Sequence, residues 1–325
     1  MSTAYSVPLQ RSLTGPMGEF LGIDTSNYTT SAALLQGGEI LQKKKLLPVR
    51  AGELGLRQSD AVFHHVTGLP EVLESLPGAL KISAVGASDR PRDLPGSYMP
   101  CFSVGAGTAG SLAHILGVPF FAFSHQDGHI AAVLYSAKRL DLLEKPFLAF
   151  HVSGGTTEAI LVEPGGERVL RTKLLAGSLD LKGGQAVDRV GAMLGLPFPS
   201  GKALEELAGK TDVQFRIKPS MKGANCSLSG IENKCKAMLL AGQSREEIAS
   251  FCIQSVLAAL DGMASALILQ YGELPMVFAG GVSSNGMIRN ALSQKYGALF
   301  ASPEFSSDNA AGIAVLTAAK AGAEI

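Results

Sequence analysis

The chain has 325 residues, of which 46% are hydrophobic and 17% are charged. This composition can build one large core or two smaller ones, and chains of this length commonly divide into two units. The 28 basic and 28 acidic residues give a formal net charge of zero. That balance excludes a strong positive field that would hold nucleic acid or an anionic membrane by charge alone.

The first residues have no apolar periodicity and contain Pro8 and Pro16, which predicts a flexible extension over residues 1–19. Met17 stands just before the first apolar segment, so either Met1 or Met17 is compatible with the natural start. No secretory signal is recognisable, and the four cysteines form no C-x-x-C pair. No apolar run reaches about 18 residues, the length of a membrane-spanning helix. We therefore expect a cytoplasmic protein with reduced thiols and no membrane span.

Two segments, residues 20–41 and 147–170, resemble each other at a constant offset. Each reads as an apolar strand, a polar turn, a second apolar strand and a Gly-Gly turn, which predicts a β-hairpin in both places. Unrelated hairpins can share residues by chance. The identities cluster at the turn, as with Thr30 and Thr157, and this favours a duplication.

Helical spacing of apolar residues follows each hairpin, and short apolar runs indicate further strands. Alternating strands and helices in two similar halves predict an α/β fold with two duplicated lobes and a central cleft. We place the N-terminal lobe at residues 20–140 and the C-terminal lobe at residues 141–325, and we expect the final helix to pack back on the first lobe. The predicted helices cover residues 59–76, 106–116, 186–194, 202–207 and 246–271, and the predicted strands cover residues 82–87, 120–123 and 276–279.

Three polar turns follow or connect the predicted strands, where backbone N–H groups could hold phosphate oxygens. Hydroxyl side chains add donors, and glycine lets a ligand approach the backbone closely. The alternative for each turn is that it only reverses the chain, and the sequence contains no P-loop motif. The candidate residues are Asp24, Thr25 and Ser26 in the first turn, Ser153, Gly154, Gly155 and Thr156 in the second, and Gly280, Gly281 and Asn285 in the third.

An acidic residue, Asp188, lies in the segment that opens the predicted helix after the second hairpin, and Gly201 follows thirteen residues later. A carboxylate in that position can accept hydrogen bonds from a ribose, as in other nucleotide sites. Alternatively, Asp188 only favours the N-terminus of its helix.

The sequence SHQDGHIAAVL places His125 and His129 four residues apart. On a helix, residues i and i+4 share one face, so both imidazoles can reach one metal ion. Asp308, before the apolar terminal helix, is the best candidate for a third ligand, and two histidines with one carboxylate suit Fe²⁺ or Zn²⁺. An incidental pair is the alternative. We interpret His151, in a strand of the second hairpin, as a packed residue.

With these motifs in place, the chain resembles the TsaD (Gcp) family of tRNA adenosine threonylcarbamoyltransferases, once called O-sialoglycoprotein endopeptidases. The resemblance runs from about Leu21 to the C-terminus. Its most specific pieces are HQDGH, VSGG, the spacing from Asp188 to Gly201, SLSG, AGGVSSN and SDNAAGIA. It implies the actin-like, Hsp70-like ATPase (ASKHA) fold with duplicated lobes.

The resemblance also implies a reaction: transfer of a threonylcarbamoyl group from threonylcarbamoyl-AMP to N6 of adenosine 37, in tRNAs that read codons starting with A. His125, His129 and Asp308 would hold one divalent metal ion. The implied partners are a smaller paralogue of the same fold and a P-loop ATPase (TsaB-like and TsaE-like), with tRNA bound through the complex; a homodimer is an open alternative. The residues implied for the adenylate are Val152, Ser153, Gly154, Gly155, Thr156, Asp188, Gly201 and Asn285.

The chain departs from the family pattern near the reacting groups. Tyr28 and Thr29 replace the acidic pair of ETSCDET, Thr156 replaces the histidine of VSGGH, and Gln185 replaces the glutamate of GEAFD. Residues 95–100 replace the GPGL stretch. These changes favour an alternative in which a divergent paralogue binds a nucleotide or acyl-adenylate without modifying tRNA.

Two further interpretations are weaker. A metalloprotease would need a glutamate as general base beside its histidines, and the residues between His125 and His129 are Gln-Asp-Gly. The basic run of Lys43, Lys44, Lys45 and Arg50 is either a solvated face or a point of tRNA contact.

Overall fold

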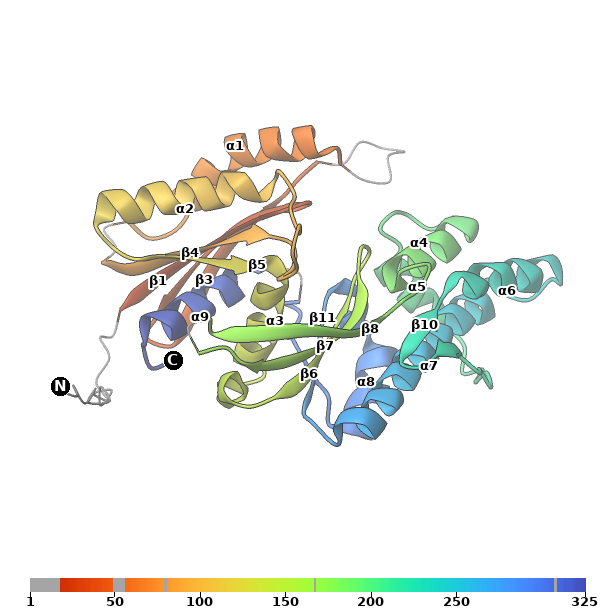
Figure 1. The fold of residues 1–325 in the computed structure, drawn as a ribbon. Helices are drawn as coiled ribbons and strands as arrows, with labels where there is room; N and C mark the ends of the chain where they lie inside the picture. Colours follow the sequence, from red (N-terminus) through yellow and green to blue (C-terminus); the bar gives the residue numbers. More distant parts are fainter. Residues whose placement is uncertain (1–17, 49–55, 79–80, 167, 307–308) are drawn as a thin grey trace.

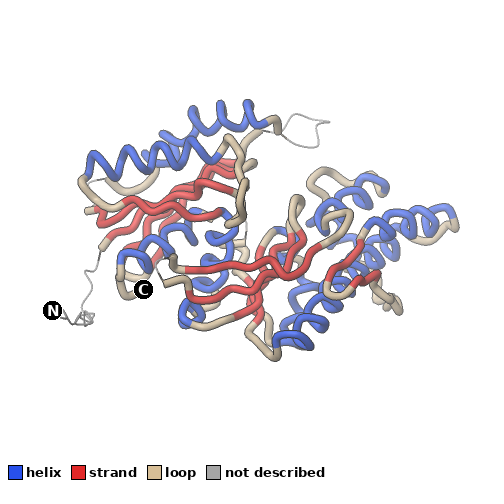
Figure 2. The backbone as a smooth tube through the Cα atoms, in the orientation of Figure 1, coloured by secondary structure: helices blue, strands red, loops and turns tan. Residues whose placement is uncertain are grey.

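The structure is a computed structural model that describes residues 18–48, 56–78, 81–166, 168–306 and 309–325. Its described part contains two five-stranded mixed sheets, each covered by helices on its outer face (Figures 1 and 2). Helices between the sheets join the two lobes. This is the α/β arrangement with two related lobes that the repeat predicts.

The first sheet has the strand order β3-β2-β1-β4-β5. Strands β3, β2 and β1 pair antiparallel, and β4 and β5 run parallel to β1. Helices α1 and α2 cover its outer face (Figure 1). The bounds are β1 Glu19–Ser26, β2 Thr29–Gln36, β3 Glu39–Leu46, α1 Gln58–Glu74, β4 Ile82–Arg90, α2 Phe102–Leu116 and β5 Phe120–Ser124.

The second sheet repeats this plan with the order β8-β7-β6-β11-β12. Strands β6, β7 and β8 are antiparallel, and β11 and β12 continue parallel to β6. The same directions in the same order confirm the duplication. The strands are β6 Phe147–Val152, β7 Thr157–Pro164, β8 Leu170–Gly177, β11 Met276–Ala279 and β12 Leu299–Phe300.

Five helices pack on the outer face of the second sheet, around the long helix α7. The most apolar part of α7 has a mean hydropathy of 1.7, enough for a membrane span by length and composition, yet 56% of that part is buried in the protein. A core helix passes the same test, so the feature carries no argument for a membrane. These helices are α4 Gly183–Met193, α5 Gly201–Ala208, α6 Ser229–Leu240, α7 Arg245–Tyr271 and α8 Gly286–Tyr296, with the small hairpin of β9 Ser220–Lys222 and β10 Asn225–Ser227 beside them.

Two helices lie between the sheets, α3 (His125–Ser136) and α9 (Ala310–Ala321). One face of α9 contributes Ala310 and Ala314 to a core with the first sheet. Its opposite face joins α3 in a core with the second sheet. Both helices are therefore buried on two sides, and α9 packs on β1, β2 and β4 as well as on α3. The boundary near residue 140 stays a prediction, because this layer is shared by both lobes.

Helix α9 comes close to its neighbours because glycines face it. A Cβ on Gly22 of β1 would lie 2.4 Å from the carbonyl oxygen of Ala310. A Cβ on Gly312 of α9 would lie 1.8 Å from the carbonyl oxygen of Gly128 in α3. Both neighbours are backbone atoms, which cannot rotate away. The glycines therefore set the spacing of this layer, and with it the position of the first turn of α3.

The predicted hairpins, helices and strands are all confirmed, within a few residues at their ends. Helices α6 and α8 were not predicted. Helix α6 buries only Ile231 and Cys235, and that is too sparse an apolar pattern to reveal a helix.

Candidate functional site

The first turn of α3 presents two histidines at the point where β5 ends. Ser124 caps this helix: its Oγ accepts a hydrogen bond from the Asp127 N–H at 3.1 Å, and Asp127 Oδ2 accepts one from the Ser124 N–H at 3.2 Å. This capping box fixes the start of the helix. The rings of His125 and His129 lie 4.8 Å apart between centroids. The predicted sharing of one helix face is confirmed.

His125 contacts two polar side chains from other parts of the chain. Its Nδ1 lies 2.9 Å from Oδ1 of the buried Asp24, and Nδ2 of Asn309 contacts the same Nδ1 and lies 2.8 Å from Nε2. Burial alone would raise the pKa of Asp24, but the charge of His125 and hydrogen bonds from His125 and Ser88 outweigh it and lower that pKa. A carboxylate behind an imidazole is the usual support of a metal-binding histidine, because it fixes the ring and its tautomer.

His129 is half-buried, and a third imidazole lies beside it. Its ring centroid lies 4.8 Å from that of His151 at the end of β6. Burial, with His125 and His151 as neighbours, holds the pKa of His129 well below its ordinary value. Burial, with the charges of His125 and Arg92, lowers the pKa of His151 to about 3. Both rings are therefore neutral near pH 7, and a neutral imidazole is the form that binds a metal.

The third predicted metal ligand, Asp308, lies outside the described residues, next to Asn309. Among the described residues, no group of three histidine, cysteine, aspartate or glutamate side chains is placed to hold one metal ion. Buried polar atoms nevertheless lack partners at this place: both ring nitrogens of His151 and Oδ1 of Asn309. Neutral imidazoles, a supporting carboxylate and buried nitrogen and oxygen atoms without hydrogen-bond partners suit a divalent cation of the zinc or iron type.

The second predicted turn connects β6 and β7 and is closed by its own backbone. The Ser153 N–H donates to the carbonyl of Thr156 at 2.8 Å, and Ser153 Oγ accepts from the Thr156 N–H at 3.2 Å. Gly154 and Gly155 are exposed at its tip, whereas Val152 is fully buried in β6. The exposed glycine backbone is suited to an anion.

Helix α4 begins against this turn. The Gly184 N–H donates to the Ser153 carbonyl at 3.1 Å, and the Gly183 N–H donates to Thr157 Oγ1 at 2.8 Å. The N-terminus of α4, with its positive dipole end, therefore adjoins the turn that is proposed to hold phosphate.

The third predicted turn follows β11 and lies beside the end of β6. Gly280 has φ of +94°, and a Cβ there would lie 2.5 Å from the Val152 carbonyl oxygen. Gly281 begins the 3₁₀ helix η2 (Gly281–Ser284), and Asn285 caps α8 by accepting a hydrogen bond from the Ile288 N–H at 3.2 Å. Asn285 thus has a structural partner already.

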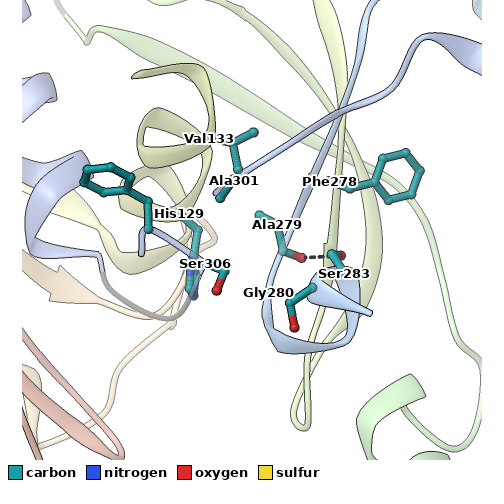
Figure 3. Close-up of a pocket in the computed structure, with 10 residues that line it drawn as sticks. His129, Val133, Phe278, Ala279, Gly280, Ser283, Ala301 and Ser306 are labelled. Carbon is teal, nitrogen blue, oxygen red and sulfur yellow. Dashed lines mark hydrogen bonds between the residues drawn. The ribbon is translucent and has the colours of Figure 1, made fainter. Parts of the chain in front are cut away.

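A small hollow of about 10 Å³, partly open to solvent, lies between α3 and this third turn. In Figure 3, His129 stands on one side of the hollow and Gly280 and Ser283 stand on the other, with Ala301 and Val133 above them in this view. Ser283 Oγ donates to the Ala279 carbonyl at 2.9 Å, which holds η2 against the strand. Here the helix that carries the histidines meets the glycine turn of the second sheet.

Asp188 and Gly201 are brought together, but by a contact within the protein. Asp188 Oδ1 accepts a hydrogen bond from the Ser200 N–H at 2.8 Å, at the start of α5. Burial raises the pKa of Asp188, although this hydrogen bond opposes the change. Asp188 keeps a second carboxylate oxygen for a ligand, and Gly201 is exposed beside it.

The first predicted turn is shorter than expected. Asp24, Thr25 and Ser26 form the last residues of β1, and the turn itself is Asn27 and Tyr28. Thr25 is fully buried and bonded to the start of α2, where its Oγ1 donates to the Cys101 carbonyl at 2.9 Å. In a sequence, polar side chains at the end of a strand resemble a loop. Here they belong to β1, and Thr25 hydrogen-bonds to a buried partner.

Three contacts near the two histidines were not predicted from the sequence. Asn309 touches His125, His151 adjoins His129, and Arg92 forms an ion pair with Glu158 that links the loop after β4 to β7. His151 alone left a signal, since it is the only titratable residue in a strand that is otherwise apolar. The other contacts join residues far apart in the chain.

Replacing Gly184 by alanine is expected to weaken nucleotide binding by about tenfold or more, because a Cβ there would lie 2.6 Å from both N and Cα of Gly154. The turn would have to move away from α4. Gly230→Ala, at the start of α6 with no atom near its added Cβ, is the matched control. Calorimetric titration of both variants with AMP checks this; equal affinity of G184A and the wild type would contradict it.

Comparison with known proteins places this geometry in context. Residues 92–315 match the family model described as TsaD, tRNA N6-adenosine threonylcarbamoyltransferase. The tRNA N6-adenosine threonylcarbamoyltransferase of Geotalea uraniireducens is 30% identical over 321 residues, covering 91% of this chain and 89% of that protein. The protein of the same description from Neorickettsia sennetsu is 31% identical, with coverage of 84% and 83%.

Solved structures of low sequence identity share the fold. Component A of (R)-2-hydroxyglutaryl-CoA dehydratase from Acidaminococcus fermentans aligns with a TM-score of 0.57 at 20% identity, covering 94% of this chain and 99% of that one. HypF from T. kodakarensis aligns with a TM-score of 0.61 at 13% identity, covering 94% and 47%. These similarities confirm the actin-like, Hsp70-like (ASKHA) fold and carry no argument about substrate.

Proposed function

Because the chain belongs to the TsaD family of tRNA N6-adenosine threonylcarbamoyltransferases, we propose that it transfers a threonylcarbamoyl group from threonylcarbamoyl-AMP to N6 of a tRNA adenosine. The observation that carries the proposal for this chain is that His129 of α3 and Gly280 of the turn after β11 line one small hollow. An acyl-adenylate bound over its open side would have its phosphate near glycine backbone and its acyl group near the histidines.

The metal in this proposal is a single Fe²⁺ or Zn²⁺ ion held by His125 and His129, with Asp308 as the expected third ligand. When bound, such an ion supplies Lewis-acid polarisation of the carbamoyl oxygen and a template for the acyl group. Asp24 would keep Nδ1 of His125 engaged at 2.9 Å, and Nε2 would reach the ion once the amide of Asn309, which lies 2.8 Å from it, moves aside.

Backbone groups and one carboxylate would bind the phosphate and the ribose of the substrate. The exposed backbone N–H groups of Gly154 and Gly155 would donate to the phosphate, beside the positive dipole end of α4. The free oxygen of Asp188 would accept a hydrogen bond from the ribose. The N6 amine of the adenosine then attacks the carbamoyl carbon, the bond from that carbon to the phosphate oxygen breaks, and AMP leaves as the amine loses a proton.

Partners and compartment are part of the same proposal. With a net charge of zero, the chain would bind tRNA through a complex with a smaller paralogue of its fold and a P-loop ATPase, in the cytoplasm. Lys43 and Lys45 lie on the edge strand β3, where Lys45 also pairs with Glu71 at 2.5 Å. That edge is one place where tRNA contact can be tested.

The deciding experiment is reconstitution of the full chain with both partners, unmodified tRNA and threonylcarbamoyl-AMP, followed by nucleoside mass spectrometry. We expect threonylcarbamoyladenosine to accumulate only when this chain is present. Absence of that nucleoside, under conditions in which a homologous transferase produces it, would refute the transferase proposal.

A second function is favoured by one observation. Tyr28 is 41% exposed at the turn after β1 and, with Thr29, stands where the family pattern has two carboxylates. Without them the chain would bind an adenylate and release it unchanged. In that case calorimetry would detect AMP binding while the wild type forms no product, and the double variant Tyr28→Asp with Thr29→Glu would gain product.

A further inference from the structure

The loop after β4, residues 91–101, contacts strand β7 of the second sheet through an ion pair. Arg92 Nη1 donates to Oε1 of Glu158, the second residue of β7. The Glu158 side chain is 10% exposed, whereas the Arg92 side chain is 40% exposed. The carboxylate is therefore part of the buried face of the sheet, and a ligand can reach the guanidinium from solvent.

The strand register shows which face of the second sheet carries this pair. Glu158 lies opposite His151 of β6, so the two side chains share a face. His151 lies against His129 of α3, with ring centroids 4.8 Å apart. Side chains alternate along a strand, and Thr157 on the other face accepts a hydrogen bond from the start of α4. The ion pair is therefore on the side of the histidines, and helix α4 is on the opposite side.

Both members of the ion pair keep unused hydrogen-bonding capacity. Oε2 of Glu158 is buried without a partner, and buried polar atoms are nearly always paired. Arg92 uses only Nη1 of its guanidinium, and within the described residues its Nε and Nη2 make no hydrogen bond. A guanidinium with two N–H groups on one free edge can bind a carboxylate through two parallel hydrogen bonds. The pair thus offers two donors for an anion beside one acceptor for a hydroxyl or N–H group.

The position of Arg92 distinguishes between two anionic groups of an acyl-adenylate. The phosphate is proposed to bind at Gly154 and Gly155 beside the start of α4, and α4 packs on the face of the sheet opposite to Glu158. The acyl group is proposed to lie near the histidines, on the same face as Glu158. The arrangement therefore favours a carboxylate on the acyl group as the partner of Arg92.

We propose that Arg92, positioned by Glu158, selects the acyl donor by binding the carboxylate of an amino-acid-derived acyl group. Oε2 of Glu158 accepts a hydrogen bond from a hydroxyl or N–H of the same group. The inference rests on the proposed function and deepens it, because it names the part of the donor that this chain recognises. Acyl groups without a free carboxylate are then poor ligands.

The test measures ligand binding to the full chain by calorimetry, without tRNA or partner proteins. The three ligands are AMP, a non-hydrolysable sulfamoyl analogue of threonylcarbamoyl-AMP with a free carboxylate, and the methyl ester of that analogue. The wild type should bind the free acid about tenfold or more tightly than the ester, because the ester loses the charge-assisted hydrogen bonds. Arg92→Gln should remove this preference and leave the Kd for AMP unchanged.

Two further variants separate recognition from structure. Arg92→Lys keeps a cation beside Glu158 but lacks the planar pair of N–H groups, so it should fold and show a smaller preference for the acid. Arg168→Gln is the matched control. Arg168 also ties this loop to the second sheet, because it pairs with Asp93 at 2.8 Å from the turn between β7 and β8. That variant should keep the preference of the wild type.

The outcomes distinguish this inference from the transferase proposal. Equal affinity of the wild type for acid and ester, or a preference that R92Q retains, would overturn the role of Arg92 and leave the transferase proposal standing. The inference would also be wrong if R92Q weakened all three ligands alike, or if R168Q lost the preference too. A preference that depends on Arg92, in a chain that forms no threonylcarbamoyladenosine, would support the inference and refute only the transfer.

Discussion

Alanine at His125 or His129 is expected to lower threonylcarbamoyl transfer by at least about 100-fold and to abolish bound metal after dialysis. Each substitution removes one of two imidazoles whose rings lie 4.8 Å apart at the start of α3. The fold should survive, because His125 is partly exposed and the cap of α3 is made by Ser124 and Asp127, which remain. Nucleoside mass spectrometry of the reconstituted reaction and metal analysis of the purified chain provide the two readouts.

The control for this prediction is His114→Ala, an exposed histidine of α2 that lies away from the centre. It should retain full activity and metal. If H125A and H129A kept both their metal and their activity, the histidine pair would be incidental. If they kept metal but lost activity, the histidines would act on the substrate directly, and the ion would have to lie elsewhere.

Gly312→Ala is expected to destabilise the chain by on the order of 3 kcal/mol and to weaken the metal centre at the same time. The added Cβ would lie 1.8 Å from the Gly128 carbonyl oxygen and 2.9 Å from the Ala132 nitrogen, both in the backbone of α3. Neither atom can move without shifting the helix that carries His125 and His129. Urea unfolding and Zn²⁺ titration should therefore change together.

Gly110→Ala in α2 is the matched control for helical glycine. No atom lies within 4 Å of its added Cβ, so alanine there should leave stability unchanged or raise it by up to about 1 kcal/mol. Equal stability of G312A and the wild type would show that α9 can move away from α3 at no cost, and would contradict the argument that glycine sets this spacing.

Much of the fold could be read from periodicity. The two hairpins, the helices and the strands follow from local patterns of apolar residues, which reflect contacts that every strand or helix must make with a core. The duplication was visible because the polar turns of both hairpins had to reverse the chain in the same way. Helix α6 was missed because it buries only two side chains.

Only part of the candidate site could be predicted from the sequence. The spacing of His125 and His129 is a property of one helix, and the sequence alone determines that they share a face. The glycine turns at residues 153–156 and 280–281 were also visible, since glycine at a strand end typically marks a turn or a close approach to the backbone.

What only the tertiary structure decided is which distant residues meet. Asp24 reaches His125 because β1 and β5 flank the same strand, β4. His151 reaches His129 because α3 lies across the second sheet. These contacts join segments with no periodic relation in the chain, so no local pattern records them. The sequence thus determined the elements and the chemistry each carries, and the packing of α3 and α9 between two sheets decided which of them form one site.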